Sequence, residues 1–303
     1  MRMLALKGER LITKHFLTWY QRENTDSIGV EQFKIDDGTI DLCVFRWFSE
    51  IELQCLGVEC KTTASPGNIY SHLVQLDRYR ETFPTIYLLV RTVRKQEAVK
   101  DVCKAKGIGL FRAASATNVE PLMEAGARES NEAKYAAIRS IGAALFCFKD
   151  EFPTASLESW GARIPTSPGR VQYNAFLNTP TNECRFGVNA ENLHTAGILE
   201  RWDGLTRAMG KLPDTALVRL WKNLQQGHLR NVIPVTTISA SDFDGAVIKE
   251  GLKRGKNESW HINVSVPLWS SYDFLTRTQH ASRFKKAVRT LTPVFNTMGG
   301  SLS

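Results

Sequence analysis

The sequence predicts an α/β protein with a mixed sheet flanked by helices, followed by a second, α+β domain. Two observations carry this prediction. Segments rich in β-branched and aromatic residues alternate with helix-like segments over the first 115 residues, whereas residues 151–180 contain four prolines and show no periodicity. A chain of 303 residues is long enough for two domains. We therefore expect an N-terminal domain over residues 1–150 and a C-terminal domain over residues 151–303.

The first half of the chain is expected to follow the order α-β-β-β-α-β-α-β. Its first three strands are close together in sequence and suit an antiparallel meander, whereas helices that can serve as parallel crossovers separate the later strands. Apolar residues at helical spacing indicate the helices, and runs of β-branched, aromatic or cysteine residues indicate the strands. The expected elements are a helix over residues 3–22, strands over 30–35, 40–48 and 51–61, a helix over 70–83, a strand over 85–90, a helix over 95–106, a strand over 108–112, and an Ala-rich helix over 125–148.

The second half has weaker patterns. Helical spacing predicts helices over residues 193–209 and 215–226 and a basic helix over 281–291. Strand-like runs occupy residues 231–238 and 262–266. No motif in this half can be tied to chemistry. Its expected role in DNA binding or regulation depends on its basic residues and on four tryptophans that could stack on bases: Trp202, Trp221, Trp260 and Trp269.

Composition excludes several classes of protein. The most apolar run, residues 136–148, is shorter than the roughly 20 residues that span a bilayer, and it contains Arg139. Charged residues interrupt residues 1–20, where a secretory signal needs an apolar core. The six cysteines include no C-x-x-C pair. We therefore expect a soluble, cytoplasmic protein with no membrane partner, whose cysteines are buried and reduced.

The charge of the chain favours a polyanionic partner. The formal net charge is +8, and the segment after Gly245 holds nine Lys or Arg against three Asp or Glu. Four of these basic residues lie on the expected C-terminal helix and could follow a phosphate backbone: Arg283, Lys285, Lys286 and Arg289. The alternative is that this helix face is simply solvated.

The most informative pattern places three charged residues in otherwise apolar strands. If residues 48–50 form a hairpin turn, position i pairs with about 99 minus i, and Asp41 lies opposite Val58 or Glu59. Glu59 and Lys61 are two residues apart on one strand, so they point to the same face. Asp41, Glu59 and Lys61 should therefore converge.

Such a cluster suits a divalent cation. Two neighbouring carboxylates repel each other, and one ammonium group offsets only part of that repulsion. Mg²⁺, with Mn²⁺ as a substitute, prefers a few carboxylates together with waters and phosphate oxygens. We expect the cation to polarise a phosphodiester and activate water, while Lys61 orients that water and balances charge in the transition state.

These residues resemble the PD-(D/E)XK nuclease superfamily, and the resemblance covers about residues 5–115. It implies a restriction-endonuclease-like fold for the N-terminal domain. Asp41 is similar to the first acidic residue of the family, although isoleucine rather than proline precedes it, and Glu59-Cys60-Lys61 is similar to the E-x-K motif. Glu9 matches the acidic residue that some members add to the metal shell.

A second motif lies downstream. Gln75 and Tyr79 fit the Q-x-x-x-Y signature of the RecB-like branch, on the helix expected after the E-x-K strand. An i, i+4 pair shares one helix face. The resemblance therefore implies an amide and a phenol directed towards the rim of the active site, where they could order Lys61 and bind a phosphate or a base.

Each motif has a structural alternative. Asp41, Glu59 and Lys61 could form a structural ion-pair cluster, and Glu9 could lie on a solvated helix face. The chain also holds an unrelated E-x-K at Glu132-Ala133-Lys134, in a helical stretch where i and i+2 do not share a face.

The sequence thus predicts a Mg²⁺-dependent DNA endonuclease, whose role could be restriction, repair, recombination or defence. Two alternatives remain. One is a catalytically silent DNA-binding or assembly protein on the same fold, and the other is a nuclease gated by an effector that binds the C-terminal domain. A symmetric homodimer is compatible with double-strand cleavage, although no residue indicates it.

Overall fold

The computed structural model divides into two compact units, Met1–Ala143 with Leu157–Trp160 and Ala144–Ser156 with Gly161–Ser303, here called the N-terminal and C-terminal units. Helix α4 (Glu132–Glu151) contributes residues to both units, whereas the sequence places the division after residue 150. The structure describes residues 2–35, 38–126, 129–158, 161–164, 171–178, 183–191, 193, 197–226, 229–245, 248–249, 260–270 and 275–300.

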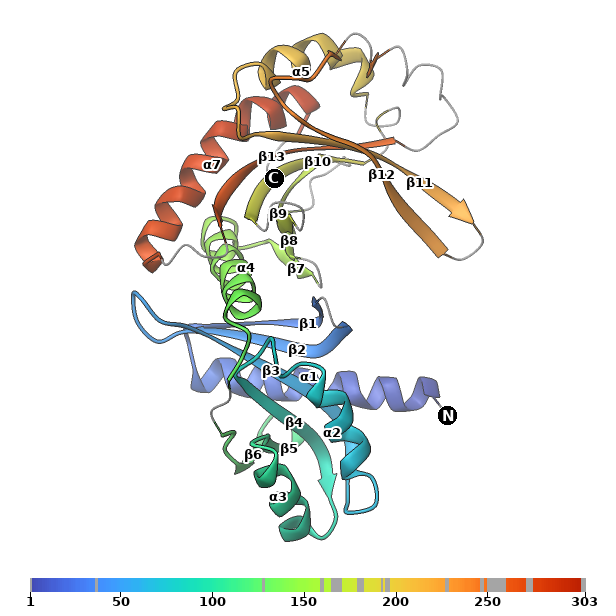
Figure 1. Ribbon diagram of the computed structural model, residues 1–303, viewed down its shortest axis with the longest axis vertical. Helices are drawn as coiled ribbons and strands as arrows, with labels where there is room; N and C mark the ends of the chain where they lie inside the picture. The colour runs from blue at the N-terminus through green and yellow to red at the C-terminus, as the bar shows by residue number, and fades with distance from the viewer. Residues whose placement is uncertain are drawn as a thin grey trace. The chain divides into compact units, whose positions relative to one another are not determined.

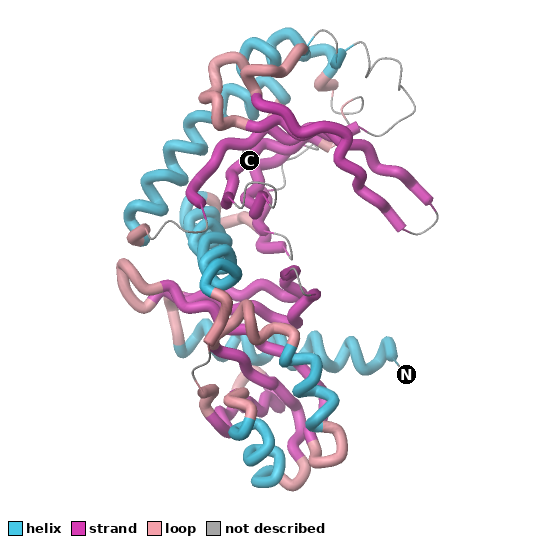
Figure 2. The backbone as a smooth tube through the Cα atoms, viewed as in Figure 1, coloured by secondary structure: helices cyan, strands magenta, loops and turns pink. Residues whose placement is uncertain are grey.

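The N-terminal unit is α/β, as predicted, and is built on a mixed six-stranded sheet (Figures 1 and 2). The strands follow one another in sequence order across the sheet; β3 and β5 each pair in parallel with β4, and the other pairs are antiparallel. Strand β6 was not expected from the sequence. The elements are α1 (Arg2–Glu23), β1 (Ser27–Ile35), β2 (Gly38–Trp47), β3 (Leu53–Ala64), α2 (Ile69–Asp77), β4 (Thr85–Val93), α3 (Gln96–Ala105), β5 (Gly109–Ser115) and β6 (Asn118–Met123), followed by α4.

Helices cover both faces of this sheet. Ile12 and Phe16 of α1 pack in one core cluster with Val58 and Cys60 of β3, so these two strand residues point into the core, as predicted. On the other face, a side chain at Gly142 of α4 would clash with the ring of Phe45, which shows how closely this part of α4 approaches β2. The sheet is thus buried on both sides, which suits its nearly continuous apolar strands.

Strands β2 and β3 pair along only part of their length. Their ladder runs from Trp47 opposite Leu53 to Leu42 opposite Val58, so position i pairs with 100 minus i. Beyond Val58, β3 continues beside β4, while β2 continues beside β1. The two strands therefore form a fork, and the next residues along them are Asp41 on β2 and Glu59 on β3.

Helix α2 is shorter than the sequence predicts. It ends at Asp77, and the turns that follow include hydrogen bonds from the Arg78 amide to the Gln75 carbonyl and from the Tyr79 amide to the Leu76 carbonyl. Three-residue spacing of this kind tightens the end of a helix into a turn. Tyr79 consequently lies after the end of the helix, although its side chain still interacts with that of Gln75.

The C-terminal unit is built on an antiparallel seven-stranded sheet with the order β12-β11-β13-β10-β9-β8-β7. Phe284 and Phe295 of α7 pack on one face against Tyr173 and Phe186 of the central strands, with ring centroids 4.2–5.0 Å apart in the closest pairs. The elements are β7 (Ser156–Glu158), β8 (Gly161–Ile164), β9 (Val171–Asn178), β10 (Glu183–Ala190), η1 (Leu199–Arg201), α5 (Trp202–Met209), β11 (Leu217–Gln226), β12 (Leu229–Ser239), β13 (Trp260–Ser270) and α7 (Arg277–Met298).

The predicted helix over residues 215–226 is wrong, because these residues form β11. Val218 and Leu220 are buried where they pair with Val264 and Ile262 of β13. A short apolar run can satisfy helical spacing and strand alternation at once, and here the neighbouring strand decided between them. The sequence also missed β10, which lies in the middle of the sheet.

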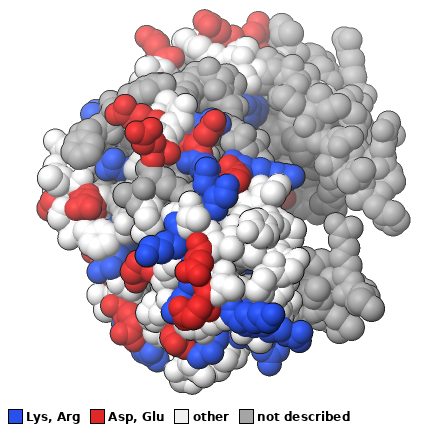
Figure 3. All heavy atoms as spheres, turned by 60° about the horizontal axis from the view of Figure 1, so that its bottom comes forward, with Lys and Arg blue, Asp and Glu red and all other residues white. Residues whose placement is uncertain are grey.

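Two predictions about the whole chain can be compared with the structure. All six cysteines are buried and carry free thiols, as predicted. None of the helices in the described part of the chain has both the length and the apolar character needed to cross a bilayer. Acidic and basic side chains are interspersed on the face shown in Figure 3.

Candidate active site

Asp41 lies at the fork between β2 and β3 and is held from both sides. Its Oδ1 accepts a hydrogen bond of 2.8 Å from Gln32 Nε2 on β1, and its Oδ2 accepts one of 2.8 Å from the backbone amide of Cys60 on β3. Because β3 has left β2 at this point, the Cys60 amide is available to a side chain. The fork therefore places the Asp41 carboxylate beside the E-x-K segment.

Glu59 is the most buried acidic group of the site, with only 1% of its side chain exposed. Its Oε1 accepts hydrogen bonds from Lys61 Nζ and from Gln75 Nε2 of α2, each 2.5 Å long. Its Oε2 is also buried and accepts no hydrogen bond from a described residue, and it could be paired only by a proton shared with the Asp41 carboxylate when Glu59 is neutral. One half of this carboxylate is thus fully paired, and the other half is not.

The pKa values of Glu59 and Lys61 are shifted because these charged groups are buried close to Asp41. Burial and the nearby Asp41 carboxylate raise the pKa of Glu59 from 4.5 to about 7, although Lys61 opposes the shift. Burial also disfavours charge on Lys61, but Glu59, Asp41 and Glu9 outweigh it and raise the pKa of the lysine. Lys61 therefore stays protonated at neutral pH and can act as a cation, not as a base.

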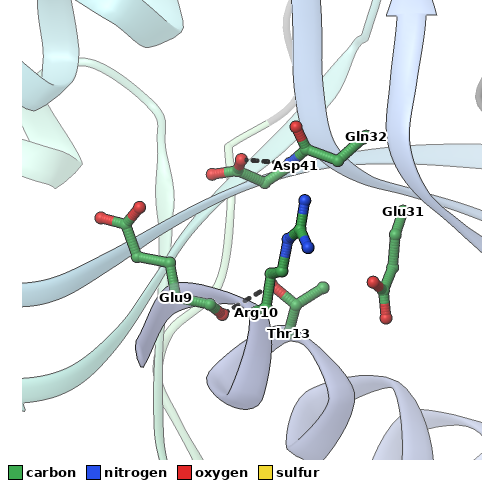
Figure 4. Close-up of a pocket in the computed structure, with 6 residues that line it drawn as sticks. All are labelled: Glu9, Arg10, Thr13, Glu31, Gln32 and Asp41. Atoms are coloured by element: carbon green, nitrogen blue, oxygen red, sulfur yellow. Dashed lines mark hydrogen bonds between the residues drawn. The ribbon is translucent and has the colours of Figure 1, made fainter. Parts of the chain in front are cut away.

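Glu9 lies near this cluster, on α1. Burial and Asp41 raise the pKa of its carboxyl group, while Lys61 lowers it. Figure 4 shows Glu9 on α1 and Asp41 on a strand, both lining a small pocket between the helix and the strands. The residues that line this pocket are Glu9, Arg10, Thr13, Glu31, Gln32 and Asp41.

The two residues of the Q-x-x-x-Y motif lie beside Glu59 and contact each other, but they make different hydrogen bonds. Gln75 orders Glu59 directly, as described above. The Tyr79 side chain is buried, and its hydroxyl donates a 2.8 Å hydrogen bond to the backbone carbonyl of Thr39. The phenol also interacts with the Gln75 side chain, and burial together with the nearby Glu59 and Asp41 carboxylates raises its pKa, so it lies beside the cluster. Because Thr39 is two residues before Asp41, Tyr79 anchors the strand that carries the acid.

The structure therefore brings Asp41, Glu59, Lys61 and Gln75 together, with Tyr79 beside Gln75 and Glu9 at the edge of the group. Sequence reasoning missed Gln32, and no signal in the sequence could have identified it, because its role depends on a backbone conformation that is unusual for glutamine. The predicted nucleic-acid-binding residues are exposed on α7 of the C-terminal unit: Arg283, Lys285, Lys286 and Arg289.

The carboxylates of the site fit a divalent cation. Within the described residues, no three His, Cys, Asp or Glu side chains form a set that could hold a metal ion. However, Mg²⁺ is commonly bound by one or two carboxylates, with waters and phosphate oxygens as its other ligands. A cation between Asp41 and Glu59 would give Glu59 Oε2 the partner it lacks and offset the repulsion between the two acids.

Comparisons of the chain with protein-family models, with curated proteins and with solved structures found no match in any of the three.

Proposed function

We propose that the N-terminal unit is a Mg²⁺-dependent deoxyribonuclease domain of the restriction-endonuclease-like type. The observation that carries the proposal is the Glu59 carboxylate, which is buried beside Asp41 with Oε1 doubly hydrogen-bonded and Oε2 without a partner among the described residues. An unpaired buried carboxylate oxygen is costly, and such groups are concentrated at functional sites. The resemblance of Asp41 and Glu59-Cys60-Lys61 to the PD-(D/E)XK motif supports the same conclusion.

Each residue of the site has a distinct task in this mechanism. Asp41 and Glu59 would hold Mg²⁺, which when bound supplies positive charge to a phosphodiester and makes water more acidic. Lys61 is 18% exposed, so its ammonium group can reach both Glu59 and a substrate at the surface. There it would orient the attacking water and offset the negative charge that develops on phosphorus-bound oxygens. Gln75 and the Cys60 amide keep the two carboxylates in place.

A purely structural ion pair explains the site less completely. Lys61 and Gln75 account for Glu59 Oε1, but a structural pair would not need a second carboxylate beside Glu59 or an unpaired Oε2. Removing Asp41 would make such a pair more stable, because its charge raises the pKa of Glu59. The presence of Asp41 at the fork is therefore better explained by catalysis than by stability.

Substitution of the three charged residues tests this proposal. We expect Asp41→Ala, Glu59→Ala and Lys61→Ala each to fold and bind DNA but to lose at least about 100-fold in cleavage, the scale on which catalytic electrostatic groups act. Plasmid, linear, single-stranded and branched DNA should be incubated with each variant in Mg²⁺, Mn²⁺, Ca²⁺ or EDTA. Ca²⁺ should support binding with little turnover, because its looser coordination positions water poorly.

The unrelated E-x-K of α4 supplies the matched control. Lys134 pairs with the exposed Glu81 on the surface, at 2.7 Å. Glu132→Ala combined with Lys134→Ala should therefore leave cleavage unchanged. Loss of cleavage in this control with retention in Glu59→Ala would show that the active site lies elsewhere, and full activity in excess EDTA would remove the cation from the mechanism.

A further inference from the structure

The backbone of Gln32 is strained. Its φ is +52°, and Lys95 is the only other described residue besides glycine with a positive φ. This left-handed region is unfavourable for residues with a Cβ atom, and glycine adopts it at little cost. Non-glycine residues remain there when the surrounding structure determines their conformation, often at functional sites.

The strain coincides with a break in the β1–β2 ladder opposite Asp41. Glu31 pairs with Leu42 and Phe33 pairs with Ile40, but Gln32 and Asp41 do not join the ladder between them. The register is the same on both sides of the break, so no residue has been inserted. At this break, Gln32 Nε2 donates a 2.8 Å hydrogen bond to Asp41 Oδ1.

This hydrogen bond completes the fixation of Asp41. The Cys60 amide holds Oδ2 from β3, and Gln32 holds Oδ1 from β1, so the carboxylate cannot rotate without losing one of the two donors. Each oxygen retains a lone pair for a further partner. A glycine at position 32 would relieve the strain but would carry no amide to reach Asp41.

We infer that Gln32 is a positioning residue that fixes the orientation of Asp41 for cation binding and cleavage. The inference rests on the proposed function, because it assigns Asp41 to a divalent cation. Groups that hydrogen-bond a ligating carboxylate typically change metal affinity by about 10- to 100-fold when they are removed. Gln32 is exposed, so replacing it opens no cavity in the core.

The test measures Mn²⁺ affinity of the full chain by isothermal titration calorimetry in the absence of DNA. A cleavage assay on the same variants accompanies it. Gln32→Met keeps the length of the side chain but removes the donor, and Gln32→Gly removes the donor together with the strain. We expect both variants to bind Mn²⁺ at least about 10-fold more weakly, with cleavage reduced in parallel and thermal midpoints near that of the wild type. Gln54→Met, an equivalent change on β3 at the far end of the β2–β3 ladder, should leave Mn²⁺ affinity unchanged.

Asp41→Asn separates failure of this inference from failure of the proposed function. If Asp41→Asn loses Mn²⁺ binding while Gln32→Met and Gln32→Gly bind like the wild type, Gln32 has no positioning role but the cation site stands. If Asp41→Asn binds Mn²⁺ as tightly as the wild type, the cation site itself is wrong. A Gln32→Gly variant that folds and binds Mn²⁺ normally overturns the inference even if Gln32→Met fails to fold.

Discussion

The two units each bury a charged side chain, but they differ in how completely that side chain is hydrogen-bonded. Arg185 of the C-terminal unit is 2% exposed, and all three of its nitrogens donate hydrogen bonds: Nη1 to Glu183 at 2.6 Å, Nε to the Ser265 hydroxyl at 3.1 Å, and Nη2 to the backbone carbonyls of Thr215 and Ser265 at 2.6 and 3.0 Å. Glu59 of the N-terminal unit is equally buried, but one of its oxygens has no described partner.

The difference separates a structural charge from a functional one. A buried charge is tolerated when its hydrogen bonds are complete, and Arg185 meets that condition by linking β10, β13 and the segment before β11. Glu59 does not meet it, and a second carboxylate beside it increases the cost. Completing the hydrogen bonds serves stability, whereas leaving one oxygen open provides a position for a ligand.

The largest effect on stability should come from Arg185→Leu. This change leaves the Thr215 carbonyl and the Ser265 groups without their donor inside the sheet, and we expect it to destabilise the C-terminal unit by about 3 kcal/mol. Urea unfolding of the full chain measures it, with Arg207→Leu on the exposed face of α5 as the control. A destabilisation below about 1 kcal/mol would break the comparison, because Arg185 would then contribute little to stability.

Glu59→Gln should stabilise the protein at alkaline pH, whereas Arg185→Leu should destabilise it. Because the pKa of folded Glu59 is raised to about 7, the folded state binds its proton more tightly than the unfolded state, and stability falls as pH rises from about 4.5 through 7. We therefore expect the variant to be more stable than the wild type at pH 8 without divalent cations, by at most about 3 kcal/mol, and by less than about 1 kcal/mol at pH 5.

Thermal unfolding at both pH values in EDTA measures this effect. Glu97→Gln, at a highly exposed position on α3, is the control and should show no such pH dependence. Added Mg²⁺ should narrow the gap at pH 8 by stabilising only the wild type. A wild type that is more stable than Glu59→Gln at pH 8 would mean that Glu59, like Arg185, is held for stability.

The smallest effect concerns the basic face of α7. Replacing Arg283, Lys285, Lys286 and Arg289 with alanine should preserve the helix, because these side chains are exposed and alanine favours helix formation. Removing a side chain that binds a phosphate should flatten the dependence of log K on log salt by about 0.9. Binding to duplex DNA across a salt series in Ca²⁺ measures the slope. The control is the double variant Arg207→Ala with Lys211→Ala, on and just after α5. An unchanged slope in the quadruple variant would mean that the basic face of α7 does not contact DNA.

Sequence reasoning succeeded where local chemistry determines the outcome. Alternation along β3 was enough to place Glu59 and Lys61 on one face and Val58 and Cys60 in the core, because side chains of a strand alternate strictly. The hairpin register was one residue from that observed, since the exact turn was not known. Sequence reasoning failed over residues 215–226, because this segment pairs with β13 as a strand although its apolar spacing also fits a helix.

The sequence by itself determined which residues could supply charge to a site and which faces of the strands had to be buried, because both follow from side-chain chemistry and backbone periodicity. Only the tertiary structure decided how these charges are paired. The fork between β2 and β3 exposes the Cys60 amide to Asp41, the break opposite Asp41 brings in Gln32, and α2 supplies Gln75, while the turn after α2 bonds the Tyr79 hydroxyl to the Thr39 carbonyl. Each of these depends on a neighbouring element distant in sequence, whose hydrogen bonds no local pattern encodes.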